Sequence, residues 1–202
     1  MKARIPILSV AILCVFILSC ASSRITSTWK DENYTGGPIE TVLVMGISDE
    51  KQNRRIFEDV FVKEFKAIGI EALASYTIFP EDREIEASEI KAAARQRNID
   101  RVLMTHLVGV EKKDVYHPPI STPAYTYTYG NYYHTVYNYT HQPGYYTQHE
   151  YVKLESGLYD AETETLIWSA ATETVDPDNV AAAVTGLSRV IFKNLRESGL
   201  LP

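Results

Sequence analysis

Histidines and acidic residues are the side chains of this sequence that could bind a metal ion or act as an acid–base pair. Four of the five histidines fall within segment 117–149, at His117, His134, His141 and His149. Imidazole is a common ligand of zinc, copper and nickel, so these four are the candidate metal ligands. Their spacing matches no compact ligand motif, and no carboxylate lies among them. We therefore predict no metal site and no cofactor.

Two acidic runs, 81–89 and 160–164, hold the carboxylates that an acid–base pair would need. A solvated loop and helix start is the simpler interpretation of the first run. No G-x-S-x-G, P-loop or H-E-x-x-H motif is present. We expect no enzyme, unless acids of both runs converge in one pocket that a tyrosine-rich segment, 115–149, also lines.

Tyrosine is the residue with an unusual distribution. Ten of the 14 tyrosines lie in segment 115–149, which contains no Asp, Glu, Lys or Arg. Tyrosines alternate on both sides of Gly130-Asn131, a fitting two-residue turn, and predict a hairpin. Its candidate contact residues are Tyr125, Tyr127, Tyr129, Tyr132, Tyr133, Tyr137 and Tyr139.

Three interpretations of that segment stay open. The segment is a loop without a binding role inserted between two strands, a recognition arm, or an element that self-associates or lies at the membrane interface. Tyrosine offers a large, rigid contact area with a hydroxyl group, as in antibody paratopes, and the ligand of an arm would be a protein or a glycan. A segment without charges also lacks the residues that block edge-to-edge strand pairing.

The N-terminus has the pattern of a secretory signal. Lys2 and Arg4 precede an apolar run that ends in Ser19-Cys20. This resembles the bacterial lipobox, although Leu18 stands where a small residue is usual. The resemblance implies cleavage before Cys20 and its lipidation, which anchors the protein to a membrane. Ala21 and Ser22 follow, without the Asp that marks inner-membrane retention, so we expect outer-membrane sorting.

Charge and cysteine content narrow the classes of partner. The pI of about 5.4 argues against nucleic-acid binding. Cys14 lies in the leader, so the mature chain keeps only the lipidated Cys20, which leaves no disulfide and no thiol chemistry. We expect the lipid to supply the membrane contact and leave the oligomeric state open.

The remaining sequence predicts one mixed α/β domain. Apolar runs at 41–47, 70–79 and 101–110 are typical of strands, and apolar stripes predict helices at 50–68, 88–98 and 177–198. Strands 151–159 and 166–175 alternate as a hairpin. Right-handed crossovers make the first three strands parallel neighbours. The order is β-α-β-α-β-(insertion)-β-β-α, a sheet of about five strands flanked by three helices.

Charged residues within these elements have structural interpretations. Arg54, Arg55, Glu58 and Asp59 are spaced for i,i+4 pairing on an exposed helix face. His106 alternates with apolar residues in the third strand, which indicates a satisfied core histidine.

Seven short stretches share a pattern with known proteins: Trp29–Asp31, Val42–Gly46, Arg54–Asp59, Ala74–Tyr76, Asp100–Met104, Leu158–Asp160 and Leu166–Ala170. Together they resemble a large family of bacterial envelope lipoproteins with a domain of unknown function, over residues 29–114 and 150–202. The element order is also similar to the N-terminal domain of the Tol-system propeller protein and to part of the curli-secretion lipoprotein. The resemblance implies an outer-membrane anchor facing the periplasm and carries no catalytic residues.

These observations give a signal peptide at 1–19, a tether at 20–40, and a domain at 41–202 with the insertion 115–149. The expected function is non-catalytic binding or assembly at the cell envelope, with an envelope protein or glycan as partner. The alternatives are an enzyme acting on envelope glycans and a metal-binding protein that uses the insertion histidines.

Overall fold

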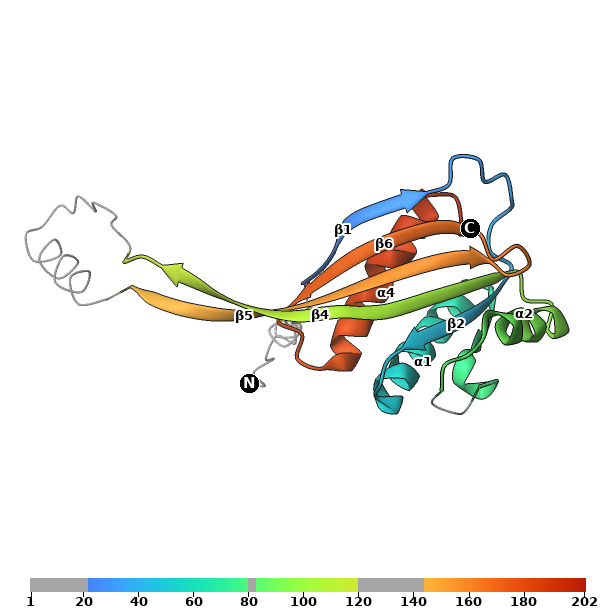
Figure 1. Ribbon diagram of the computed structural model, residues 1–202. Coiled ribbons are helices and arrows are strands. Elements are labelled where there is room, and N and C mark those ends of the chain that lie inside the picture. Colours follow the sequence, from blue (N-terminus) through green and yellow to red (C-terminus); the bar gives the residue numbers. More distant parts are fainter. Residues whose placement is uncertain (1–21, 80–82, 120–143) are drawn as a thin grey trace, which may run out of the picture.

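The computed structural model describes residues 22–79, 83–119 and 144–202. They form a six-stranded mixed sheet in the order β1-β6-β5-β4-β2-β3 (Figure 1). The strands are β1 (Ser22–Lys30), β2 (Thr41–Ile47), β3 (Glu71–Ala74), β4 (Arg101–His117), β5 (Tyr145–Asp160) and β6 (Leu166–Val175). The helices are α1 (Lys51–Ala67), α2 (Ala87–Gln96) and α4 (Val180–Glu197), and the short 3-10 helix η2 (Ser75–Thr77) follows β3. The predicted mixed α/β class is confirmed.

Strand β2 and the first part of β4 are covered on both faces, as their apolar runs predict. Along β2, Val42 and Val44 point into a cluster with α1 and α4, whereas Leu43 and Met45 point into a second cluster with α2. Strands β3, β2 and β4 are parallel. The connections β2-α1-β3 and β3-α2-β4 run in opposite directions along the sheet, so right-handed crossovers place α1 and α2 on opposite faces.

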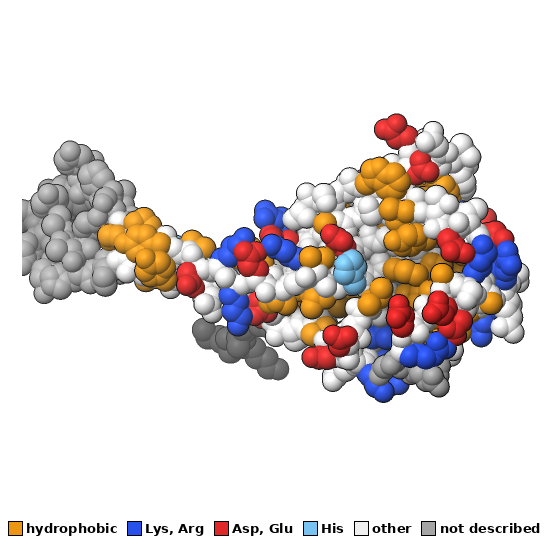
Figure 2. Space-filling model, in the orientation of Figure 1, with side chains coloured by type: hydrophobic (Ala, Val, Ile, Leu, Met, Phe, Trp, Pro, Cys, Tyr) orange, Lys and Arg blue, Asp and Glu red, His pale blue; other side chains and the backbone are white. Residues whose placement is uncertain are grey.

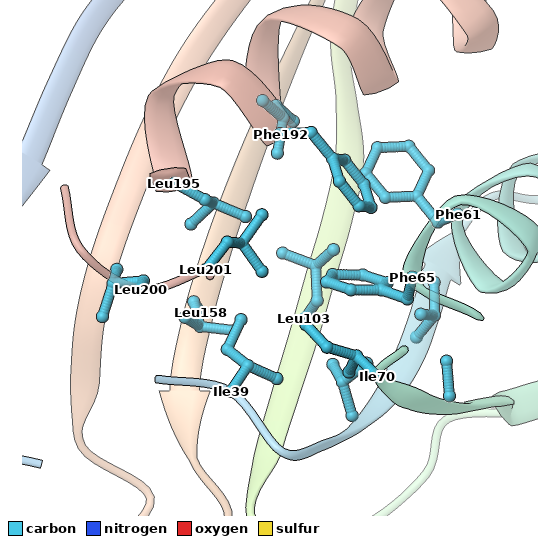
Figure 3. Close-up of a cluster of buried hydrophobic side chains, with 14 of the residues drawn as sticks. Ile39, Phe61, Phe65, Ile70, Leu103, Leu158, Phe192, Leu195, Leu200 and Leu201 are labelled. Atoms are coloured by element: carbon cyan, nitrogen blue, oxygen red, sulfur yellow. The ribbon is translucent and has the colours of Figure 1, made fainter. Parts of the chain in front are cut away.

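Aromatic side chains hold α1 against α4. The Phe192 ring lies 4.5 Å from that of Phe65 and 5.9 Å from that of Phe61. Leu103 of β4 and Leu158 of β5 are fully buried in the same cluster (Figure 3). Burying side chains of this size stabilises the fold by about 1.5–3 kcal/mol each, so this layer is the main core.

The last two strands form the expected antiparallel hairpin. Its turn follows Asp160, whose Oδ1 accepts hydrogen bonds from the backbone N–H of Glu162 at 3.0 Å and of Thr163 at 2.9 Å. Asp favours such turns because its side chain satisfies the backbone two residues on. Helix α4 then returns over the hairpin, where Asn194 accepts a 2.8 Å hydrogen bond from the buried indole of Trp168.

The sheet has six strands rather than about five, because Ser22–Lys30 forms β1 within the stretch assigned to a tether. It pairs antiparallel with β6. Its exposed Ser and Thr residues look like a linker in sequence, but an edge strand with one solvated face accommodates them. The second predicted strand, 70–79, is also shorter than expected: β3 spans Glu71–Ala74, and the chain turns at η2.

The hairpin of β4 and β5 is longer than its apolar residues predict. Pairing continues from Arg101↔Asp160 to His117↔Tyr145, past the predicted strand limits of Val110 and Tyr151. Figure 1 shows the two strands leaving the sheet together as a ribbon. The first and last residues of the predicted insertion are therefore strand residues.

Candidate functional site: the arm and its neck

The ribbon becomes two-stranded where β6 ends. The last β5–β6 pair is Tyr151↔Val175, and the last β2–β4 pair is Ile47↔His106. Beyond them, Lys112–His117 and Tyr145–Glu150 pair only with each other among the described strands. We call these two stretches the arm. Six residues at about 3.3 Å each give it a length of about 20 Å.

Charged side chains surround the base of the arm. Glu111 pairs with Lys153 at 2.6 Å and with Lys113 at 3.3 Å, and Lys112 lies 3.7 Å from Glu150. The hydrogen bond from Lys153, followed by that from Lys113, lowers the pKa of Glu111. Figure 2 shows these charges gathered between the domain and the outer part of the arm. Charges at this position discourage unspecific strand pairing.

Aromatic side chains replace the charges further out. Tyr116 and Tyr146 are 51% and 71% exposed, and their rings lie 4.9 Å apart. On the other face, the His117 ring stacks on Tyr145 at 4.7 Å. Aromatic pairs across strands stabilise a hairpin by about 0.2–1 kcal/mol each. The outer arm therefore carries a ring pair on each face; Figure 2 shows a hydrophobic patch on the face in view.

A chain of hydrogen bonds links the arm to the end of β6. Thr147 Oγ1 lies 2.8 Å from His117 Nε2 and 3.1 Å from His149 Nε2. The second ring nitrogen of His149, Nδ1, lies 2.5 Å from the Asp176 carboxylate. The strand register thus brings together two histidines that are far apart in the sequence.

We call the region where β6 ends beside β5 the neck (Glu150, Tyr151, Val175 and Asp176). Asp176 binds the backbone of β5 there. Its N–H donates to the Glu150 carbonyl at 2.8 Å, and its carboxylate accepts from the Glu150 N–H at 2.7 Å. Its φ of 45° lies in the left-handed region that Asp tolerates better than most residues. The hydrogen bond with His149, followed by that from Glu150, lowers the pKa of Asp176.

Several predicted site residues lie outside the described residues. They are Cys20, Tyr125, Tyr127, Tyr129, Tyr132, Tyr133, Tyr137, Tyr139, His134 and His141. The described tyrosines of the same uncharged segment, Tyr116, Tyr145 and Tyr146, are the ones placed on the arm. Asp176 was not predicted as a site residue, because Asp-Pro at a helix start is typical of an N-cap; the N-cap of α4 is Asn179.

The prediction of a core histidine at His106 is wrong. Its side chain is 48% exposed and lies 3.7 Å from Glu155, which is its direct partner on β5. Burial along β4 ends at Thr105, and Ile47, the β2 partner of His106, is 58% exposed, so this part of the face is uncovered. The ladder then shifts register at Leu107/Gly109. The side chains past this irregularity belong to the exposed ribbon.

A cavity of about 730 Å³ opens at the carboxyl ends of β2 and β3, where ligands of open α/β sheets commonly bind. Arg54 and Ser75 line it, with Asp49, Arg83 and Glu84. A second, mostly apolar cavity of about 400 Å³ lies between α1, α4 and the base of the ribbon. The lining of the first cavity includes no arm residue and no residue of 160–164.

The prediction that Arg54 and Glu58 lie on an exposed helix face is also wrong. Glu58 is fully buried and Arg54 is 9% exposed. Arg54 Nε donates to Glu58 at 3.0 Å, and Ser75 donates to the same carboxylate at 2.7 Å. Glu58 also accepts from the backbone N–H of Gly46 at 3.0 Å and of Tyr76 at 2.9 Å. The pair ties α1 to the ends of β2 and β3.

The acidic runs are engaged in surface ion pairs. Glu89 pairs with Arg83 at 2.6 Å, and this guanidinium lowers the pKa of Glu89 to about 2. Glu164 pairs with Lys91 at 3.2 Å, and Glu162 pairs with Arg95. Glu81 and Asp82 lie outside the described residues. The described acids of the two runs therefore do not meet in a pocket that the arm lines.

Within 22–79, 83–119 and 144–202, no group of three or more His, Cys, Asp or Glu side chains is placed to hold a metal ion. His117 and His149 nevertheless approach one hydroxyl group, which their sequence spacing does not suggest.

None of the helices in the described part of the chain has the length and apolarity that a membrane span requires.

Comparisons with known proteins return structures but no sequence family. No protein-family model matches the chain, and no curated protein sequence matches it. A PelC dodecamer from Paraburkholderia phytofirmans, in two crystal forms, is similar at 12% and 13% identity and TM-scores of 0.46 and 0.45; each match covers 85% of this chain and 95% of that one. The lipoprotein GNA1162 from Neisseria meningitidis is similar at 8% identity and a TM-score of 0.42, over 78% of this chain and 98% of that one. The suggested likeness to the Tol-system propeller protein is not supported by these matches.

Proposed function

We propose that this protein is a lipid-anchored, non-catalytic protein of the bacterial cell envelope that binds a membrane-associated protein partner through its arm. The observation that carries the proposal is the arm itself: a two-stranded ribbon that leaves the sheet and presents paired aromatic rings. Cys20 is the anchor in this proposal, and the periplasmic face of the outer membrane is its location.

The start of β1 supports the choice of a partner near the membrane. Ser22 pairs with Val175, and Val175 pairs on its other side with Tyr151. Strand β1 therefore begins at the neck, and Ala21 alone separates it from Cys20. An anchor at Cys20 would hold the neck close to the membrane surface, so the arm starts beside the bilayer.

The free edges of the arm favour a protein over a glycan. The backbone N–H and C=O groups that point outward from Lys112–His117 and Tyr145–His149 face no further strand among the described elements. An extended peptide satisfies such groups by adding a strand, while side chains on alternate positions give specificity. A glycan would use only the rings. The exposed Tyr116, Tyr145 and Tyr146 then supply apolar contact beside the new strand.

Quantitative capture from detergent-solubilised envelopes tests the proposal. We compare the wild-type protein with Tyr116→Ser/Tyr146→Ser, and use Trp29→Ser as the control, because Trp29 is 49% exposed on β1 away from the arm. A specific protein should be retained by wild type and by the Trp29 variant and lost with the arm variant. Equal retention by all three would contradict an arm interface, and retention of glycan alone would contradict a protein partner.

A further inference from the structure

We propose that His117 and His149 bind one divalent transition-metal ion on the arm. The Nε2 atoms of the two rings lie 2.8 Å and 3.1 Å from the same hydroxyl oxygen, that of Thr147. Both nitrogens thus point to one place on one face of the ribbon. This inference goes beyond the proposed partner binding; the two share the His117–Tyr145 ring pair, and the test below reads metal binding alone.

Asp176 orients the His149 ring and fixes which of its nitrogens carries the proton. A carboxylate accepts hydrogen bonds, so its contact with Nδ1 at 2.5 Å places the proton of neutral His149 on Nδ1. The Nε2 lone pair is then free, and in the absence of metal it accepts the hydroxyl hydrogen of Thr147. A histidine that donates Nδ1–H to a carboxylate while its Nε2 binds metal is the usual arrangement in metal sites.

His117 completes the pair from the opposite strand. Its ring is held by stacking on Tyr145, with the ring planes 15° apart. The neighbouring cation Lys113 lies toward the domain, 3.3 Å from Glu111 and over the ring of Tyr151 at 5.1 Å, so it is engaged away from Thr147. Lys113 is nevertheless the direct β4 partner of His149 and shares its face of the ribbon, so it is the described cation that the site must accommodate.

The donor set defines the class of ion. Neutral imidazoles suit zinc, copper and nickel, whereas calcium and magnesium require oxygen ligands. Two imidazoles with one hydroxyl are fewer protein ligands than the four of a structural zinc site. The ion would keep open positions for water or an outside ligand and would exchange readily. Since the ligands come from both strands, it would also clamp the arm just beyond the end of β6.

Calorimetric titration of the full-length protein in detergent tests the site, with Zn²⁺ and Cu²⁺ as probes and Mg²⁺ and Ca²⁺ as negative controls. One equivalent of Zn²⁺ or Cu²⁺ should bind, and electron paramagnetic resonance of bound Cu²⁺ should show nitrogen ligands. His117→Ala and His149→Ala should each weaken binding at least tenfold. Asp176→Asn should weaken it by about 10–100-fold, because the orienting carboxylate is lost.

Matched variants keep the proposal falsifiable. His106→Ala removes an exposed histidine of the same strand outside the site and should leave binding unchanged. The double variant His134→Ala/His141→Ala should also bind normally. Binding that survives both His117→Ala and His149→Ala, that is abolished by the double variant, or that is absent in the wild type would overturn the proposal. Circular dichroism spectra that match wild type exclude misfolding as the reason for a loss.

Discussion

Ser22 on β1 and Tyr151 on β5 flank the same residue, Val175, at the last position of β6. The first described strand and the arm thus meet at one end of the sheet. A lipid at Cys20 would therefore orient the domain as well as retain it, since Ala21 alone separates the anchor from paired backbone. The arm would then lie next to the membrane surface.

Lipidation at Cys20 is the first prediction. Cells fed an alkyne-tagged fatty acid should label the wild-type protein and leave Cys20→Ala unlabelled, because the thiol is the attachment point that the lipobox resemblance implies. Fractionation should move the variant from the membrane to the soluble fraction. Equal labelling of the two proteins would refute the anchor.

The domain should fold without the arm tip. Deleting residues 116–147 and joining the strands through a short turn leaves the buried core untouched, since its residues lie on the domain side of the neck. We expect the free energy of unfolding to change by about 1 kcal/mol or less. Urea denaturation followed by circular dichroism measures it, and loss of the cooperative transition would show that the tip is part of the folding unit.

Breaking the buried ion pair of Arg54 and Glu58 should lower the free energy of unfolding strongly. Glu58→Ala leaves a buried guanidinium without its carboxylate and should lower the free energy of unfolding by about 3–5 kcal/mol. Arg54→Met/Glu58→Leu should cost much less, because no buried charge is left unpaired. Arg55→Ala is the matched control on the exposed face of the same helix and should stay within about 0.5 kcal/mol of wild type. A small effect of Glu58→Ala would contradict this assignment.

The Asp176 carboxyl group should titrate below the ordinary pKa of an aspartate. Its folded-state pKa is below the ordinary 3.8, so its contribution to stability is present above that value and is lost as the pH falls through the lower folded-state pKa. His149→Ala removes the main cause and should raise the pKa of Asp176 toward 3.8. Carbon-13 NMR of the labelled carboxyl group measures the shift, with His106→Ala as the variant that should not move it. A downward shift in the His149 variant would contradict the contact.

The parallel strands and the hairpin were predictable because their apolar patterns reflect burial on two faces or one. The runs 42–45 and 101–105 lie between helices on both sides, whereas Leu107, Val108 and Val110 are exposed. The alternation in 151–159 and 166–175 matches the hairpin. Strand β1 was not predictable in this way. Its Ser and Thr residues carry no apolar signal, and its pairing partner, β6, lies near the other end of the sequence.

The candidate site on the arm and the buried Arg54–Glu58 pair were harder to predict, because their contacts join residues that are far apart in the sequence. Arg54 and Glu58 resemble a surface pair because periodicity cannot reveal that β2 and β3 end beside them. His117 and His149 match no linear motif, since the strand register and not the sequence spacing brings them to Thr147. Uncharged composition did mark the arm, although Tyr116, Tyr145 and Tyr146 rather than the central tyrosines are the residues whose placement is described.

Site-specific photocrosslinking in living cells tests the arm most directly. A photoreactive phenylalanine analogue replaces Tyr146, which is 71% exposed on the arm, or Trp29, which is 49% exposed on β1. We predict a discrete protein adduct of one size from position 146, and none of that size from position 29. Adducts of the same size from both positions, or lipid adducts alone from position 146, would contradict a protein partner bound through the arm.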